Sequence, residues 1–89
     1  MSTIVYYSSA TSDLAVKKRQ QSLQFLLDKK KRQYTMEDLA QMEKPQRDEL
    51  YAKANVRIIP MVFHNGKYIG GQDELQMAEE DEIFDSLFQ

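Results

Sequence analysis

The sequence predicts an α/β fold: a mixed four-stranded sheet with the element order β-α-β-α-β-β-α and helices on both faces. Three observations favour this fold. The chain opens with a β-branched and aromatic run, which a long helical segment separates from a second extended run. An Asn-Gly pair between two apolar runs indicates a hairpin, and a glycine pair after it leads into a last helical segment. Strands joined through a helix pair in parallel, whereas a two-residue turn forces antiparallel pairing.

The first strand and the first helix occupy the N-terminal third. Residues Thr3 to Tyr7 are β-branched and aromatic and predict a short buried strand. The polar loop Ser8 to Ser12 follows, and Ser12-Asp13 predicts a helix start. The helix should end between Lys29 and Arg32, where four bases complement its dipole. Its expected core stripe is Val16, Leu23, Leu26 and Leu27.

The middle of the chain predicts a strand, a loop and a helix. Gln33 to Asp38 predicts the second strand, and Gln41 to Lys44 predicts a loop. Pro45 is expected at the first helical position, where its missing N–H costs nothing, and the helix continues through Asp48 to Ala54.

A hairpin and a helix complete the chain. The apolar run Ile58 to Phe63 contains a lone Pro60, Asn65-Gly66 turns the chain, and Lys67 to Ile69 returns it. The glycine pair Gly70-Gly71 then leaves the strand, and Asp73-Glu74-Leu75 begins the last helix. The apolar side of that helix is predicted to consist of Leu75, Met77, Ala78, Ile83, Phe84, Leu87 and Phe88.

Length and composition restrict the class of protein. We expect a single domain over residues 1–89, because 89 residues enclose one core but not two. A hydrophobic content of 42% with 29% charged residues is typical of a globular chain, and a net charge of -2 gives no general attraction to nucleic acid. The apolar runs are too short to cross a bilayer, and Met1-Ser2-Thr3 lacks the basic start of a secretory signal. A cytoplasmic protein without nucleic-acid or membrane partners is therefore expected.

The chain has no cysteine. Thiol-disulfide exchange needs a thiolate, which no other side chain replaces, so that chemistry is excluded. Zinc sites of the cysteine type are excluded too, and a single histidine, His64, predicts no resident metal. We expect His64 to have a structural role at the end of its strand.

The order of strand, turn, strand, glycine pair and helix from Arg57 to Leu75 resembles the C-terminal half of glutaredoxins, which have the thioredoxin-like fold. The resemblance implies a cis peptide bond before Pro60. It also places the two positions of the glutaredoxin cysteines at Thr11 and Leu14, neither of which can supply a thiol.

The same resemblance implies a groove for glutathione or an extended peptide. Ile59, before the cis-proline, would pair its backbone with the ligand, and Gly71 would allow close approach. Gln72 and Asp73 would receive the γ-glutamyl end, and Arg57 would meet a carboxylate. The lysine that glutaredoxins often carry shortly before the cysteine is Ser8 here.

The N-terminal half resembles a narrower group, the SH3-binding glutamic-acid-rich-like proteins, whose glutaredoxin fold characteristically lacks the redox cysteines. Val5-Tyr6, the serine-rich loop, Val16 to Gln21 and Gln46 to Leu50 carry this resemblance. The chain departs from the group in two respects. The proline-rich segment before the third strand is replaced by Ile58-Ile59-Pro60, which cannot form a PxxP helix, and the acidic tail of some members is missing.

These observations favour a non-enzymatic interaction or regulatory module with a protein partner and no cofactor. A second hypothesis is a groove that binds glutathione or a peptide through Thr11, Arg57, Ile59, Pro60, Gly71, Gln72 and Asp73. A third is a transferase in which the Thr11 hydroxyl activates bound glutathione. The sequence leaves the partner and the oligomeric state open.

Charge is unevenly distributed along the chain. Lys17 to Arg32 contains seven bases against one acid, Asp28, while Asp73 to Asp85 contains seven acids and no base. The simpler interpretation is two solvated helix faces, and the alternative is a dipolar surface that docks a partner.

Overall fold

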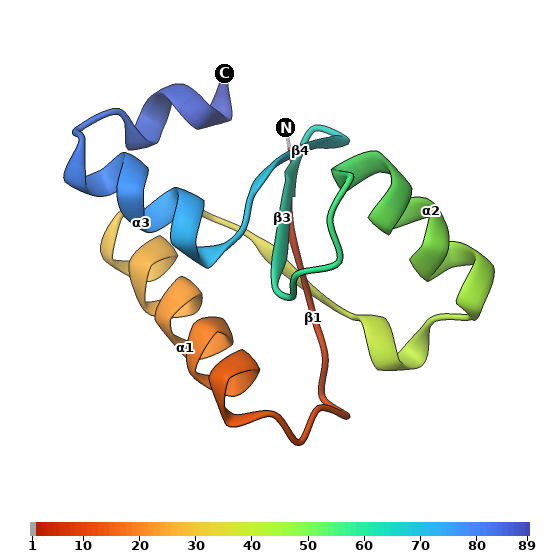
Figure 1. Ribbon diagram of the computed structural model, residues 1–89. Helices are drawn as coiled ribbons and strands as arrows, with labels where there is room; N and C mark the ends of the chain where they lie inside the picture. Colours follow the sequence, from red (N-terminus) through yellow and green to blue (C-terminus); the bar gives the residue numbers. More distant parts are fainter. Residues whose placement is uncertain (1) are drawn as a thin grey trace.

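The computed structural model describes residues 2–89 and consists of a four-stranded sheet between helices (Figure 1). The strand order is β2-β1-β3-β4; β1 pairs with β2 in parallel, and the other two pairings are antiparallel. The predicted α/β fold with a mixed four-stranded sheet is confirmed. In chain order the elements are β1 Thr3–Tyr7, α1 Leu14–Lys29, β2 Thr35–Asp38, a 3-10 turn η1 Leu39–Gln41, α2 Lys44–Ala54, β3 Met61–His64, β4 Lys67–Gly70, α3 Gln72–Glu80 and a second 3-10 turn η2 Phe84–Phe88.

Helices cover both faces of the sheet, with α1 and α3 on one side and α2 on the other (Figure 1). Successive side chains of a strand point to opposite faces, so β3 contributes Val62 to one core and Met61 and Phe63 to the other. The core under α1 and α3 consists of Val5, Leu23, Leu26, Leu27, Val62, Leu75, Phe84 and Phe88. The core under α2 consists of Leu39, Ala54, Met61 and Phe63.

Helix α1 begins and ends where the sequence predicts. Asp13 is the N-cap, because its carboxylate accepts a hydrogen bond of 2.8 Å from the amide of Ala15. Of the predicted core stripe, Leu23, Leu26 and Leu27 are buried and Val16 is half-buried. The helix therefore packs on the sheet along the face that its periodicity indicates.

The middle of the chain differs from the prediction at the element boundaries. Strand β2 begins at Thr35 and not at Gln33, and a 3-10 turn follows it directly. That turn starts at Asp38, whose carboxylate accepts a hydrogen bond of 2.9 Å from the amide of Ala40. Pro45 occupies the second position of α2 and not the first, because Glu43 is the N-cap.

The last helix is shorter than predicted. A continuous helix would place Phe84 about 180° away from Leu75, since nine residues at about 100° each separate them. The chain instead leaves the helix at Glu82, whose φ is 63°, and the amide of Ile83 donates to the carbonyl of Ala78 over 2.9 Å. This C-cap turns η2 back onto the sheet, so that Phe84 and Phe88 are buried while Met77 and Ile83 remain exposed.

The hairpin has the predicted two-residue turn. His64 pairs with Lys67, and Asn65 and Gly66 have φ angles of 52° and 83°, as a type I′ turn requires. The Ile59–Pro60 peptide bond, just before β3, is cis. No helix within residues 2–89 is long and apolar enough to cross a membrane.

Candidate functional site

The fold brings Pro60 and Gly71 into contact. A Cβ atom added to Gly71 would lie 2.9 Å from the carbonyl oxygen of Pro60, so only glycine permits this approach. Gln72 and Asp73 follow as the first residues of α3. The backbone amide of Gly71 donates a hydrogen bond of 2.7 Å to the Glu74 carboxylate, which caps the helix.

The loop after β1 uses its backbone amides within the protein. The amide of Ser8 donates to Oε1 of Gln20 over 2.8 Å, and the amide of Ser9 donates to Oδ1 of Asp38 over 3.1 Å. The amide of Ala10 donates to the Ser8 hydroxyl over 3.3 Å. These three loop amides are therefore engaged within the protein. At the helix N-terminus itself, the amide of Ala15 is engaged by the Asp13 carboxylate.

Asp38 fastens this loop to the end of β2. Its carboxylate accepts from the Ser9 hydroxyl over 2.5 Å, from the Ser9 amide and from the Ala40 amide. The hydrogen bond from the Ser9 hydroxyl is the main reason why the pKa of Asp38 lies below its ordinary value. The sequence pattern predicted Asp38 only as the end of a strand. An aspartate directly before a turn, whose carboxylate can accept from the amide two residues later, is the signal of this cap.

Thr11 is half-exposed, and its hydroxyl oxygen accepts a hydrogen bond of 3.2 Å from the amide of Asp13. Leu14, at the other glutaredoxin cysteine position, is 72% exposed. His64 lies at the opposite end of β1, because it pairs with Thr3 while Thr11 follows Tyr7. The histidine is therefore not placed to activate the threonine.

His64 has the structural surroundings expected for it. Its ring is buried, its Nδ1 lies 2.7 Å from the Thr3 hydroxyl, and the Phe88 ring meets it edge-on with 5.3 Å between the centroids. These contacts tie the start of β1 to the end of β3 and to the C-terminal turn.

Arg19 covers part of the predicted groove. Its Nε donates a hydrogen bond of 3.3 Å to the carbonyl oxygen of Ile59, the backbone acceptor next to the cis-proline. Arg57 contacts α2, where its guanidinium lies 4.9 Å from the centre of the Tyr51 ring and 3.9 Å from the Asp48 carboxylate. Ile59 and Arg57 line different hollows. The structure thus brings Ile59, Pro60 and Gly71 together and directs Arg57 elsewhere.

A shallow hollow of about 240 Å³ adjoins Ile59. Its lining comes from the loop after β1, the turn η1, helix α2 and the segment before β3, and consists of Ser8, Ala10, Leu39, Ala40, Arg47, Tyr51 and Ile59. Arg47 donates to the carbonyl of Met42 over 3.0 Å. The hollow therefore offers a mixed apolar and polar surface.

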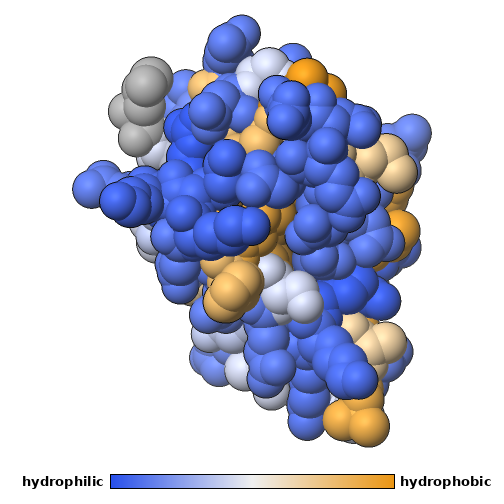
Figure 2. Space-filling model, turned by 90° about the vertical axis from the view of Figure 1, so that its left-hand side faces the viewer, coloured by the Kyte–Doolittle hydropathy of each residue, from blue (hydrophilic) through white to orange (hydrophobic). Residues whose placement is uncertain are grey.

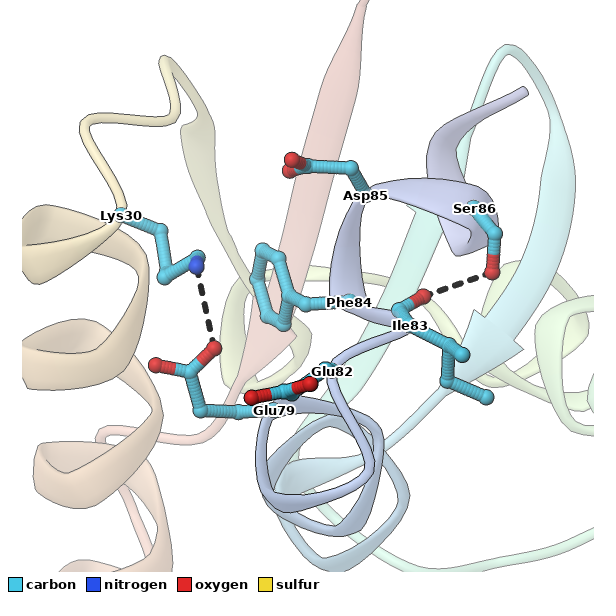
Figure 3. A pocket seen from close by; sticks show the side chains of 7 residues that line it. All are labelled: Lys30, Glu79, Glu82, Ile83, Phe84, Asp85 and Ser86. Atoms are coloured by element: carbon cyan, nitrogen blue, oxygen red, sulfur yellow. Dashed lines mark hydrogen bonds and ion pairs between the residues drawn. The ribbon is translucent and has the colours of Figure 1, made fainter.

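A larger hollow of about 500 Å³ lies between the C-terminal ends of α1 and α3 and the turn η2 (Figure 3). Glu79 and Lys30 form an ion pair of 3.0 Å at its edge, and Lys30 holds the pKa of Glu79 below its ordinary value. Phe84 lies behind this pair, with Lys30 Nζ 5.4 Å from the ring centre. Within residues 2–89, no three histidine, aspartate or glutamate side chains gather in a way that would hold a metal ion.

Comparisons with known proteins agree with this geometry. The actin interacting protein Aip5 of C. albicans is similar with a TM-score of 0.83 and 22% identity, over 98% of this chain and 87% of that one. A buckwheat glutaredoxin in complex with glutathione is similar with a TM-score of 0.75 and 20% identity, over 97% and 74%. Oxidized glutaredoxin 2 of Chlamydomonas reinhardtii has a TM-score of 0.64 and 27% identity, over 98% and 78%.

These neighbours show that the fold is glutaredoxin-like and therefore thioredoxin-like. No curated protein matches the chain. A family model described as "SH3-binding, glutamic acid-rich protein" matches residues 1–89. The chain therefore belongs to the SH3-binding, glutamic acid-rich protein family.

Proposed function

We propose that the protein is a non-catalytic protein-interaction module, a glutaredoxin frame that recognises a partner and performs no thiol chemistry. The observation that carries this proposal is the complete absence of cysteine from a chain of this fold. Thr11 and Leu14 stand at the two cysteine positions. Leucine has no nucleophilic atom, and His64 lies at the far end of β1 from Thr11 and is not placed to activate its hydroxyl. With thiol chemistry excluded, the role that we propose is the recognition of a partner protein.

The hydrogen bonds around the former active site support the proposal. Gln20 and Asp38 engage the amides of Ser8 and Ser9, and Arg19 engages the carbonyl of Ile59. A bound glutathione would have to displace the Arg19 contact in order to pair with Ile59. The protein's own side chains therefore compete with a small ligand for the groove.

The family description names SH3 binding, and a similar structure is described as an actin interacting protein. Both descriptions favour a protein partner for this chain. The chain has two prolines, Pro45 and Pro60, too far apart for a PxxP motif. We propose that the partner is recognised by the folded surface and not through a polyproline segment.

A glutathione-dependent disulfide reductase assay tests the absence of catalysis. The purified protein should give no turnover above background, because the reaction needs a thiolate. A similar glutaredoxin that contains its cysteines serves as the positive control. Turnover above background would contradict the proposal. A glutathione-conjugation activity that Thr11→Ala abolishes would support the hydroxyl-based transferase, and an unaffected conjugation rate would discard it.

A second candidate function is glutathione or peptide binding at Ile59, Pro60, Gly71, Gln72 and Asp73, which is favoured by the contact between Pro60 and Gly71. An NMR titration with millimolar glutathione distinguishes the two candidates. We expect no saturable shifts of the amides of Ile59, Gly71, Gln72 and Asp73 in the wild type.

The variant Arg19→Ala sharpens this titration, because it frees the Ile59 carbonyl. Lys53→Ala, on the opposite side of the sheet, removes one positive charge without touching the groove and is the matched control. Shifts in Arg19→Ala alone would show that Arg19 blocks the groove. Saturable shifts in the wild type would replace the interaction-module proposal by a glutathione-binding function.

A further inference from the structure

We propose that the outer surface of α1 and α3 is a self-complementary docking surface, on which a second copy of this chain binds with two-fold symmetry. The inference goes beyond the proposed function and is independent of it, because the surface lies on the helical layer and not at the hollow beside Ile59. It rests on the exposure, the charge and the placement of a few side chains on two neighbouring helices.

The outer face of α1 is apolar and basic. Leu14 and Phe25 are each 72% exposed. They are separated by eleven residues, which returns a side chain to within about 20° of the same direction and about 16 Å along the helix. Both therefore lie on the side opposite the buried Leu23 and Leu27. Exposed Lys17 and Lys18 lie between them along the chain.

The outer face of α3 is apolar and acidic. Met77 is 64% exposed and lies about 200° around the helix from the buried Leu75. The exposed carboxylates of Asp73, Glu80 and Asp81 surround it at helical spacing. The charges beside the apolar centre of α3 are all negative. Those beside the apolar centre of α1 are positive except for the exposed Asp28, whose carboxylate accepts a hydrogen bond from the Tyr34 hydroxyl.

The two faces are held in one layer. Helices α1 and α3 pack side by side on the same face of the sheet (Figure 1). Lys29 and Lys30 at the end of α1 both form ion pairs with Glu79 of α3, at 3.6 and 3.0 Å. Among residues 2–89, Lys17 and Lys18 form no ion pair, so their charges remain available to a partner.

This layer shows separate hydrophobic spots within a hydrophilic surface (Figure 2). A two-fold axis midway between the two faces brings the basic face of each copy against the acidic face of the other copy. Both contacts then bring opposite charges together around exposed apolar side chains, so the association is closed and isologous. A partner of one charge only would match one helix and repel the other, which favours a second copy as the occupant.

The size of the surface sets the expected strength. Helix α1 has 16 residues and is about 24 Å long, so a layer of two helices offers a small interface. Small interfaces are typical of weak, transient complexes. We therefore expect a dimer with a micromolar to millimolar Kd that dissociates as salt is raised.

Charge reversal provides the test, with sedimentation equilibrium of the full chain as the measurement. One variant combines Lys17→Glu and Lys18→Glu, and the other combines Glu80→Lys and Asp81→Lys. The new acids lie near the start of α1 and the new bases at the end of α3, where each suits the helix dipole and preserves the fold. Each variant alone should weaken dimerisation by at least about tenfold, because both contacts become repulsive.

An equimolar mixture of the two variants should form a heterodimer about as strong as the wild-type dimer, because both contacts are then attractive again. Lys44→Glu combined with Lys53→Glu changes the net charge as the first variant does, but on α2 at the other face of the sheet. This control should dimerise like the wild type. A wild-type protein that stays monomeric up to about 1 mM, or a mixture that fails to associate, would overturn the proposal.

Discussion

At the scale of single residues, three side chains hold the loop after β1 and the segment before β3. Gln20 accepts from the Ser8 amide, Asp38 from the Ser9 amide and hydroxyl, and Arg19 donates to the Ile59 carbonyl. Each bond joins residues at least 12 positions apart in the chain. Tertiary hydrogen bonds therefore add to the local ones that Ser8 and Thr11 accept within the loop after β1.

Asp38→Asn should make the protein less sensitive to acid. The folded-state pKa of Asp38 is below its ordinary value of 3.8. Its stabilising contribution is thus fully present above that value and is lost as the pH falls through the folded-state pKa. The drop in thermal stability between pH 7 and about 3 should be smaller in Asp38→Asn than in the wild type.

Ser9→Ala gives an independent check on this prediction. It removes the hydroxyl that is the largest cause of the lowered pKa of Asp38, so it should also reduce the acid sensitivity. Wild-type acid sensitivity in both variants would rule out the contribution of Asp38. The residual loss would come from Asp48 and Glu79, whose pKa values are also lowered, by lysine partners.

The candidate site could be predicted from the sequence only in part. The proximity of Pro60 to Gly71 follows from the order of strand, turn, strand and glycine pair, because a two-residue turn fixes how the two strands pair. The contacts of Arg19, Gln20 and Asp38 depend on how α1 and β2 sit beside the loop, so no spacing in the sequence reveals them. Arg57 was predicted to face the groove, but the aromatic ring of Tyr51 attracts its guanidinium toward α2.

At the scale of elements, the hairpin depends on its turn. Gly66 has a φ of 83°, and nothing lies within 4 Å of the position that its Cβ would occupy. A side chain there would meet no steric obstacle from the rest of the protein, so a substitution changes only the backbone energy of the left-handed conformation.

Gly66→Ala should lower the free energy of unfolding by about 1 to 2 kcal/mol, measured by urea denaturation. Gly66→Asn is the matched control and should cost less, because asparagine tolerates this conformation. An equal loss in both variants would show that the strain at position 66 is not the cause.

Two elements show what periodicity alone predicts. In α1 the buried residues recur at helical spacing, and the predicted face is correct. In the last segment the apolar residues from Leu75 to Phe88 suggested one helix, but a single straight helix cannot bury both Leu75 and Phe84. Tertiary packing determines where this helix ends. The sequence does not indicate the end, because Glu82, which adopts the positive φ, is neither glycine nor asparagine.

At the scale of the molecule, the sheet separates two apolar clusters, one on each face, where a single core was predicted. The C-terminal turn closes the larger cluster. Phe84 is 2% exposed and Phe25 is 72% exposed. Because both residues are phenylalanines, replacing each by alanine isolates the effect of burial on the free energy of unfolding.

Phe84→Ala should lower the free energy of unfolding by about 3 to 5 kcal/mol, because it leaves a cavity under α1 and α3. Phe25→Ala should change it by less than about 0.5 kcal/mol. Chemical denaturation of both variants at low protein concentration is the measurement. Similar values for the two would mean that η2 does not close the core.

The overall architecture was predictable because its strands and helices alternate with clear patterns and short connections. The parallel pairing of β1 with β2 and the hairpin both follow from the linking segments. The antiparallel pairing of β1 with β3, which completes the strand order, depends on tertiary packing. The starts of β2 and α2 were less predictable. Strand β2 begins two residues later than predicted, and α2 begins one residue earlier because Glu43 is its N-cap.

The two edge strands of the sheet have features that reduce aggregation. Both β2 and β4 have only four residues, and they carry Glu37 and Asp38 on one edge and Lys67 on the other. Short, charged edges discourage the intermolecular strand pairing that leads to fibres. We therefore expect these edges to resist the addition of strands from other copies of the chain.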